Sequence, residues 1–243
     1  MKDSAIVLHA FDYGESDRII DLLTLHHGRV RAIAKGAKRS RRRFLNALEP
    51  FTHLSVEIVC GRTASAMSRI DSAVIKRNFP VLYNRYGHYL AASLCCELVS
   101  MWTREWDGAG DVYRLLLWYF DMLAISQAPL TATIFFKIYL LKMSGYGITG
   151  SQCKMCGVGV RECERWKFDP GEGGFICGRC SLDDAELTRD IPAIVQKILD
   201  SDKILCNRLK ISDRQVKHIW QILEDMNCYH LGKRPVAYKL IKI

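Results

Sequence analysis

The sequence predicts an α+β protein in which a small five-stranded barrel precedes a mainly α-helical domain with a four-cysteine module. Three observations predict this architecture. Short apolar runs separated by glycines fill the first 80 residues. Apolar residues then recur at helical spacing, and two C-x2-C pairs interrupt the helices. We therefore expect two domains, residues 1–80 and 81–243, with the cysteine module at about residues 150–182.

The five expected strands are rich in β-branched and aliphatic residues. Leu54, Val56 and Ile58 alternate with neighbours that are mostly more polar, as in a strand that buries one face. The other four apolar runs cover residues 6–8, 19–25, 30–34 and 67–75. Strands this close together leave no room for crossover helices, so they are expected to form an antiparallel barrel or sheet. The five-stranded OB-fold is the natural candidate.

After Pro80 the apolar period becomes that of helices. The first stripe predicts a helix with a buried face and consists of Leu82, Tyr86, Tyr89, Leu90, Leu94, Leu98 and Met101. Apolar spacing and terminal residues predict four more helices: residues 111–125, residues 130–143, a short helix opening at Pro192, and a long helix capped by Ser212 and Gln215 that ends near Gly232.

The most specific motif is a quartet of cysteines: Cys153, Cys156, Cys177 and Cys180. Each C-x2-C pair lies on a tight turn that directs two sulfurs at one ion, and two pairs complete the tetrahedral set of a structural zinc. Four sulfurs leave no open coordination position, so we expect one Zn²⁺ that stabilises the domain and activates no water. Four unrelated buried thiols are the alternative. Residues 166–176, between the pairs, predict a short hairpin.

Composition indicates a soluble globular protein. Of 243 residues, 49% are hydrophobic and 25% are charged, and the N-terminus lacks the basic and apolar segments of a signal peptide. Charged residues interrupt every apolar stretch before it reaches membrane-spanning length. We therefore expect a cytoplasmic protein with reduced thiols, whose other cysteines are small buried hydrophobes: Cys60, Cys95, Cys96, Cys163, Cys206 and Cys228.

Positive charge is concentrated near the N-terminus. Of the net charge of +9, +6 lies in residues 1–80, which hold 14 Lys and Arg against 8 Asp and Glu. Six cations fall within residues 35–43, the basic segment, and residues 30–48 contain no Asp or Glu. Such a segment repels itself, so we expect a projecting loop that binds nucleic-acid phosphates. The expected binding residues are Arg29, Arg31, Lys35, Lys38, Arg39, Arg41, Arg42 and Arg43.

A solvated loop without a ligand is the alternative interpretation of this charge. Nothing in the basic segment reads bases, so binding should be largely independent of nucleic-acid sequence. Tyr13, Phe44 and Phe51 lie close enough in the sequence to stack on bases, although core packing explains each of them as well.

The sequence contains no recognisable catalytic motif. It lacks the phosphate-binding G-x-x-x-x-G-K-[ST] loop and the H-E-x-x-H pattern of zinc proteases. Glu15 and Asp17 are a candidate carboxylate site for a nuclease or hydrolase, but we expect them to begin a strand and to pair with Arg18. The sequence therefore predicts a protein without enzymatic activity.

Several short motifs together carry a resemblance to a known family. They are residues 7–8, 13–18, 27–29, 34–37 and 48–51 near the N-terminus, and residues 135–147 and 173–174 in the helical part. In this order and spacing they resemble the bacterial recombination mediator family RecO over nearly the whole chain. That family has zinc-binding and zinc-free members, and the intact cysteine quartet resembles the former.

The resemblance implies an N-terminal OB-fold, a helical C-terminal domain that holds zinc, and no catalysis. It implies a role in recombinational repair, with single- and double-stranded DNA bound and complementary strands annealed. It also implies three protein partners: RecR, the C-terminal tail of the single-stranded-DNA-binding protein SSB, and, indirectly, RecA.

The tail of SSB is expected on the helical domain, where residues 135–142 offer apolar side chains beside Lys137 and Lys142. Either Lys137 with Leu141 or Ile138 with Lys142 could form its rim. A nucleoid-associated location in the bacterial cytoplasm follows from the same resemblance. An OB-fold and zinc-ribbon protein that binds RNA or acts in translation is the alternative function, and a preference for RNA over DNA would favour it.

Overall fold

The structure is a computed structural model that describes residues 1–40, 42–61, 66–181, 185–201 and 209–241. The chain divides into two compact units, Met1–Ile125 and Ser126–Ile243. The expected boundary after residue 80 marks the change from strands to helices. The compact units divide later because the first three helices pack with the barrel.

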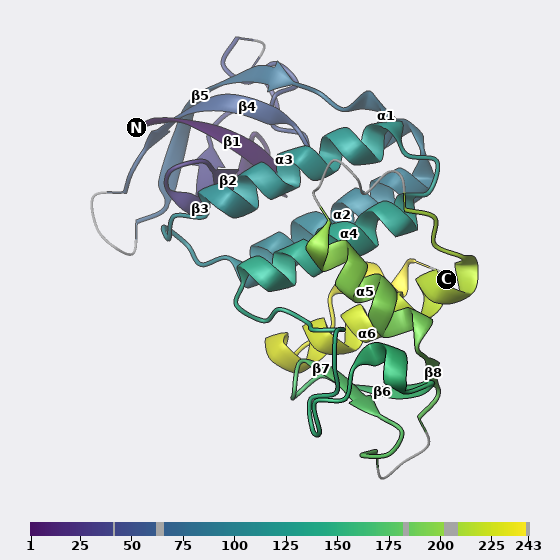
Figure 1. Ribbon diagram of the computed structural model, residues 1–243. Coiled ribbons are helices and arrows are strands. Elements are labelled where there is room, and N and C mark those ends of the chain that lie inside the picture. The colour runs from purple at the N-terminus through teal and green to yellow at the C-terminus, as the bar shows by residue number, and fades with distance from the viewer. Residues whose placement is uncertain (41, 62–65, 182–184, 202–208, 242–243) are drawn as a thin grey trace. The chain divides into compact units, whose positions relative to one another are not determined.

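Unit 1 begins with a closed barrel of five strands: β1 (Lys2–Tyr13), β2 (Asp17–Thr24), β3 (Gly28–Ala34), β4 (His53–Val59) and β5 (Ser68–Arg77). Their order is β1-β2-β3-β5-β4, and β4 pairs with β1 to close the barrel (Figure 1). The five predicted strands and the OB-fold are confirmed. β3 and β5 are parallel, whereas the other strand pairs of the barrel are antiparallel. The sequence did not predict this exception, because apolar runs carry no information on strand direction.

Alternating side chains of all five strands fill the barrel. Its core contains Ala5, Val7, Ile20, Leu22, Val30, Ala32, Ala34, Leu54, Val56, Ile58, Ile70 and Ala73. Phe44, Ala47 and Leu48, from the connection between β3 and β4, join the same core. This connection therefore does not project as a whole: Phe44, Ala47 and Leu48 pack onto the barrel, and the described cations and Leu45 stay exposed.

Three helices complete unit 1: α1 (Pro80–Asn84), α2 (Tyr86–Trp102) and α3 (Gly110–Ile125). The single helix expected from residue 82 is broken at Arg85, whose φ of −121° and ψ of 115° are extended. α2 packs on β1, and α3 packs on β2. The ring of Phe120 on α3 lies 5.8 Å from that of Phe51 and 5.4 Å from that of Phe79, centroid to centroid.

The described part of unit 2 contains three helices, α4 (Pro129–Met143), α5 (Asp190–Asp200) and α6 (Asp213–Leu231), and two short 3-10 turns, η1 (Val160–Glu162) and η3 (Val236–Lys239). α4 packs against both α5 and α6. Ser212 and Gln215 form the predicted capping box, and Gly232 ends α6 with a φ of 66°. No helix within the described residues combines the length and apolarity that a membrane crossing requires.

A three-stranded ribbon completes unit 2. Its strands are β6 (Arg165–Asp169), β7 (Gly174–Cys177) and β8 (Leu187–Thr188), in the order β7-β6-β8. The Asp169 carboxylate accepts hydrogen bonds from the N–H groups of Gly171 (2.8 Å) and Glu172 (3.0 Å), which fixes the turn between β6 and β7. The predicted hairpin between the cysteine pairs is confirmed.

Candidate metal centre and nucleic-acid interface

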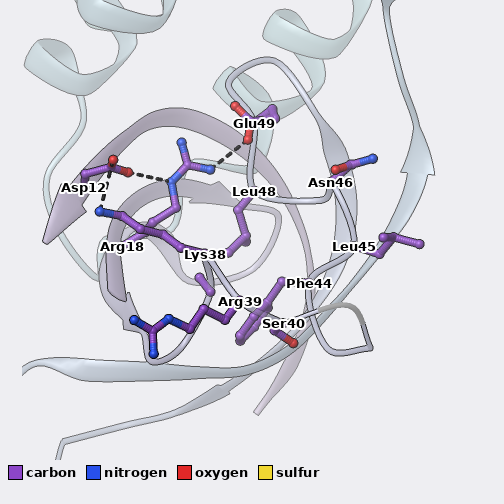
Figure 2. A pocket seen from close by; sticks show the side chains of 11 residues that line it. Asp12, Arg18, Lys38, Arg39, Ser40, Phe44, Leu45, Asn46, Leu48 and Glu49 are labelled. Atoms are coloured by element: carbon purple, nitrogen blue, oxygen red, sulfur yellow. Dashed lines mark hydrogen bonds and ion pairs between the residues drawn. The ribbon is translucent and has the colours of Figure 1, made fainter. Parts of the chain in front are cut away.

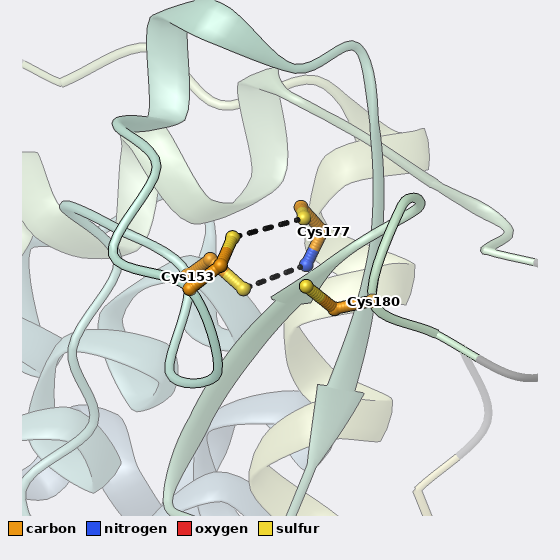
Figure 3. Close-up of side chains that lie close together, drawn as sticks. Cys153, Cys177 and Cys180 are labelled. Carbon is orange, nitrogen blue, oxygen red and sulfur yellow. Dashed lines mark hydrogen bonds between the residues drawn. The ribbon is translucent and has the colours of Figure 1, made fainter.

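The four predicted cysteines come together beside the ribbon, with Cys177 at the end of β7 and Cys180 in the turn that follows (Figure 3). All four sulfurs lie within 4.8 Å of one another, and those of Cys156 and Cys177 are 3.7 Å apart. A tetrahedral site with metal–sulfur bonds of about 2.3 Å needs sulfurs about 3.8 Å apart. The quartet could hold a metal ion, and the described residues contain no second such group.

Backbone hydrogen bonds fix the two cysteine turns. The Gly157 N–H donates to the Cys153 carbonyl at 3.0 Å, and the Cys180 N–H donates to the Cys177 carbonyl at 2.9 Å. The Lys154 N–H donates to the Phe175 carbonyl at 2.9 Å, which joins the first turn to β7. The backbone therefore holds the sulfurs in position for one ion.

The surroundings of Cys153 favour a thiolate. Burial opposes its ionisation, but N–H groups of Cys177, Cys156 and Met155 point at its sulfur, and its pKa falls to about 6. Hydrogen bonds with Cys156 and Cys177 raise the pKa of Cys180 to about 12. Four thiolates this close repel one another, so a divalent cation is what would allow all four to ionise. The donor set therefore fits a metal ion.

The basic segment presents exposed cations: Lys35, Lys38, Arg39, Arg42 and Arg43. Arg41 lies outside the described residues. Lys38 Nζ lies 3.1 Å from Asp12 and donates to the Gly14 carbonyl at 3.0 Å, and Arg43 donates to the Lys35 carbonyl at 2.7 Å. Lys35, Arg39 and Arg42 form no ion pair with another described residue, so their charge is available to a ligand.

The two β3 arginines are in a different situation, because carboxylates of the protein engage both. Arg31 donates to Asp21 through Nε (2.6 Å) and Nη2 (2.8 Å), and Asp21 is only 2% exposed. Arg29 lies 3.3 Å from Glu105 and donates to Ser100 Oγ at 3.1 Å. These arginines stabilise unit 1, and most of their charge is balanced within it.

A pocket opens beside the basic segment (Figure 2). Arg18 lies across it, with Nε 3.3 Å from Asp12 and Nη1 2.7 Å from Glu49. Since Lys38 also contacts Asp12, the two carboxylates of the pocket are already paired with cations. The remaining lining residues are Ala37, Arg39, Ser40, Phe44, Leu45, Asn46 and Leu48.

The segment with Glu15 and Asp17 has no catalytic geometry. Asp17 accepts hydrogen bonds from the Gly36 N–H (2.8 Å) and from Ser16 Oγ (2.9 Å), and the Gly36 N–H lowers its pKa. The expected pair with Arg18 is wrong, because Arg18 pairs with Asp12 and Glu49 instead. Asp17 therefore ties the turn between β1 and β2 to the start of the basic segment.

Lys137 lies in the core of unit 2. Its side chain is fully buried, and Nζ lies 4.1 Å from the ring centroid of Trp220 and 4.7 Å from that of Tyr238. Ile138 and Leu141 are buried as well. Neither expected rim pair therefore reaches solvent intact, and Lys142 is the only exposed member of the two pairs.

Comparison with known proteins divides the chain where the strands give way to helices. A family model described as "Recombination protein O N terminal" matches residues 1–79, and one described as "Recombination protein O C terminal" matches residues 84–239. The chain belongs to the RecO family. The RecO resemblance of the sequence is thereby confirmed.

Curated relatives agree with the RecO models. The DNA repair protein RecO of Anaeromyxobacter sp. (strain K) is 38% identical over 181 residues, 74% of this chain and 70% of the relative. That of Myxococcus xanthus (strain DK1622) is 35% identical over 180 residues, 74% and 72% of the two chains. That of Geobacter metallireducens is 29% identical over 232 residues, 96% and 93%. This RecO-family chain has a role in DNA repair and recombination.

The sequence did not predict two features of the molecule. The pocket joins residues from β1, β2 and the connection after β3, and no sequence spacing reveals that meeting. Tyr86 and Tyr89, expected in a buried stripe, are 72% and 40% exposed. The break at Arg85 separates only Leu82 from this stripe, so it does not explain why the two rings are exposed.

Proposed function

We propose that this RecO-family chain is a non-enzymatic mediator that binds DNA through the phosphates and acts in recombinational repair. The observation that carries the proposal is the exposed basic segment, in which Lys35, Arg39 and Arg42 have no ion pair with a described residue. Phosphates supply the missing counter-charge, and release of their counterions favours binding. Arg41 belongs to the same proposal by its place in the sequence, although it lies outside the described residues.

The pocket supports the same assignment. Arg39 and Ser40 line it beside Lys38, so a phosphate there would meet cations and a hydroxyl donor. Its two carboxylates are held by Arg18 and Lys38, which reduces their repulsion of an anion. Arg29 and Arg31 then contribute less to binding, since Glu105 and Asp21 engage them.

We further propose that the cysteine quartet holds one structural zinc. The residues that would bind it are Cys153, Cys156, Cys177 and Cys180. Four thiolates with tetrahedral spacing suit Zn²⁺, and a closed set of ligands supplies stability without activating water. The zinc would then cross-link the ribbon and take no part in DNA binding by unit 1.

Annealing of complementary strands and assistance to RecA loading belong to this proposal as the finer functions, in the bacterial cytoplasm at the nucleoid. A sequence-indifferent phosphate contact suits annealing, because it leaves bases free to pair. RecR, the SSB tail and, indirectly, RecA are the proposed protein partners. We keep the helical domain as the site of the SSB tail, with Lys142 as an exposed cation and without Lys137.

The test is DNA binding as a function of salt. If four to six cations of the basic segment meet phosphates, log K for single strands should fall with log salt at a slope of about −3 to −4. Arg39→Ala combined with Arg42→Ala should weaken binding to single and double strands of any sequence and flatten the slope by about 1.4. Lys217→Ala with Lys233→Ala removes the same charge from exposed positions of unit 2 and serves as the control.

An unchanged slope in the Arg39 and Arg42 variant would place the DNA site elsewhere. Tighter binding of RNA than of DNA of equal length and sequence would favour an RNA-binding function instead. Arg31→Ala provides a separate comparison, because it should lower the stability of unit 1 by about 1–3 kcal/mol by leaving the buried Asp21 carboxylate unpaired.

A further inference from the structure

Three tyrosines form an exposed aromatic patch at the start of the helices of unit 1. Tyr83 is 39% exposed, Tyr86 72% and Tyr89 40%. Tyr86 and Tyr89 are three residues apart on α2, so they share a face of that helix. Aromatic side chains of a helix normally pack into the core. Three exposed rings within seven residues therefore indicate a binding surface.

The ring of Phe51 holds the patch together. Its centroid lies 5.6 Å from that of Tyr83 and 5.5 Å from that of Tyr89, so the same ring supports both. Phe51 has a φ of 65°, unusual for a bulky residue, and its N–H donates to the Val7 carbonyl of β1 at 2.8 Å. The barrel therefore fixes the support of the tyrosines in place.

The aromatic patch continues the surface of the pocket. The Tyr83 hydroxyl donates to the carbonyl of Pro50, and the preceding residue, Glu49, lines the pocket and pairs with Arg18. A chain that leaves the pocket past Glu49 and Pro50 therefore meets Tyr83 next. The hydrogen bond to Pro50 therefore places Tyr83 beside the residue that follows the pocket-lining Glu49.

The charge around the patch suits a polyanion. Between Asp71 and Glu97 the sequence contains no carboxylate, and it carries Lys76, Arg85 and Arg77, the last of which pairs with Asp121 of α3. Arg85 is exposed between Tyr83 and Tyr86. Aromatic faces interleaved with cations bind single-stranded nucleic acid by stacking bases while the cations follow the backbone.

We propose that Tyr83, Tyr86 and Tyr89 stack the bases of single-stranded DNA whose phosphates lie on the basic segment. The proposal rests on the DNA-binding function above and deepens it, because it assigns a preference for unpaired bases to helices outside the barrel. In a duplex the bases already stack on one another, so only single strands can use the patch.

The experiment measures affinity for an oligothymidylate, a duplex and an abasic oligonucleotide of equal charge, with the full chain. Tyr86→Ala should weaken oligothymidylate binding about fivefold or more, leave duplex and abasic binding unchanged, and keep the salt slope. Tyr86→Phe retains the ring and should bind like the parent. Tyr229→Ala, at a 62% exposed tyrosine of unit 2, controls for loss of an exposed ring.

Each other outcome contradicts a defined part of the proposal. Oligothymidylate binding unchanged by Tyr86→Ala overturns the stacking role, as does an equal loss on the abasic strand. Loss of binding to an acidic peptide, without loss on DNA, would assign the patch to a protein. If Arg39→Ala with Arg42→Ala also leaves all DNA binding intact, the basic segment is not the DNA site and the proposed function fails at that segment; if only the tyrosine variant is silent, the basic segment stands as the DNA site and the stacking role falls.

Discussion

In the barrel every strand has two neighbours, because β4 pairs with β1, whereas the ribbon has three strands and two open edges. The barrel also surrounds a core of aliphatic side chains from all its strands. The ribbon buries few large residues, chiefly Trp166 and Phe175. A β structure this small gains little from apolar burial, so the proposed metal would add a cross-link that stabilises it.

The same difference explains the distribution of polar chemistry. Because the barrel is closed around its own core, it needs no metal for stability. Its surface can therefore carry exposed cations that bind a ligand. Beside the ribbon, by contrast, four thiols lie together at one candidate metal site. We infer that metal and DNA act on separate parts of the molecule, and three experiments can break or sharpen this comparison.

The largest effect is expected from Cys177→Ser, which removes a fully buried sulfur from the quartet. Structural zinc sites contribute an apparent binding free energy of about 10–16 kcal/mol in zinc-finger peptides at neutral pH, so the ribbon should lose most of its protection. Hydrogen exchange should accelerate at the Trp166 amide and stay slow at Val30 in β3. DNA affinity at the basic segment should be retained.

Cys163→Ser is the matched control, because Cys163 lies just before β6 and outside the quartet. It should leave exchange at Trp166 unchanged. Equal acceleration in β3 and in the ribbon after Cys177→Ser would show that the barrel also depends on the metal, and the contrast between the two regions would then fail.

The second effect is on the barrel and comes from Gly28→Ala in the turn between β2 and β3. Gly28 has a φ of +68°, and a Cβ there would lie 1.9 Å from the Asp107 carbonyl oxygen. A left-handed backbone costs about 1–2 kcal/mol for an L-residue, and overpacking adds about 1–3 kcal/mol, so we expect a loss of about 2–5 kcal/mol. Hydrogen exchange at the Val30 amide, followed as a function of urea concentration, measures this loss of stability.

Gly14→Ala is the control for Gly28→Ala, since its φ is +59° and nothing lies within 4 Å of the added Cβ. It should cost only about 1–2 kcal/mol. Equal losses of stability in the two variants would mean that the backbone at Asp107 moves away from the added methyl group without a measurable cost. Neither substitution should change exchange in the ribbon.

Local chemistry made much of this molecule predictable from the sequence. Strand alternation, the Ser212 cap and the cysteine spacing each act within a few residues, and the structure confirms them. The pairing of Arg31 with Asp21 was not predictable, because it depends on the register between β2 and β3. The burial of Lys137 was not predictable either, since Trp220 and Tyr238 lie far along the chain.

The basic segment combines both situations. Its charge density was visible in the sequence, but the same connection also buries Phe44 and Leu48 in the barrel core. A run of cations indicates exposure for those residues and says nothing of the apolar residues that follow. The pocket forms at this boundary between exposed cations and buried anchors.

The smallest effect concerns acid, which should act on the two regions through different groups. In the ribbon, protons would compete with the proposed metal for thiolates. In the barrel the relevant group is Asp3, whose side chain is fully buried. It accepts hydrogen bonds from His26 Nδ1 and His27 Nδ1, both 2.8 Å, and from the N–H groups of His26 and Ser4.

Burial raises the pKa of Asp3, but the hydrogen bonds from His27, His26 and Ser4 outweigh it and leave the pKa below its usual value. The ionised carboxylate is therefore favoured by folding. Its stabilisation is complete above the unfolded pKa of about 3.9 and is lost as the pH falls through the lower folded value. Asp3→Asn should cost about 1 kcal/mol at pH 7, and this difference should shrink below about pH 4.

The readout for Asp3 must be confined to the barrel, because acid would also release the proposed metal from the cysteine quartet. Exchange at the Val7 amide of β1, followed in the parent and in Asp3→Asn, separates the two processes. Asp71→Asn changes an exposed carboxylate of β5 that pairs with Arg69, and it should leave β1 exchange unaltered at both pH values. A constant difference between parent and Asp3→Asn from pH 7 to pH 3 would mean that Asp3 acts through packing and not through its charge. In that case the acid response of the barrel would have to come from other carboxylates whose pKa values hydrogen bonds lower, namely Asp17 through the Gly36 N–H and Glu57 through Lys2.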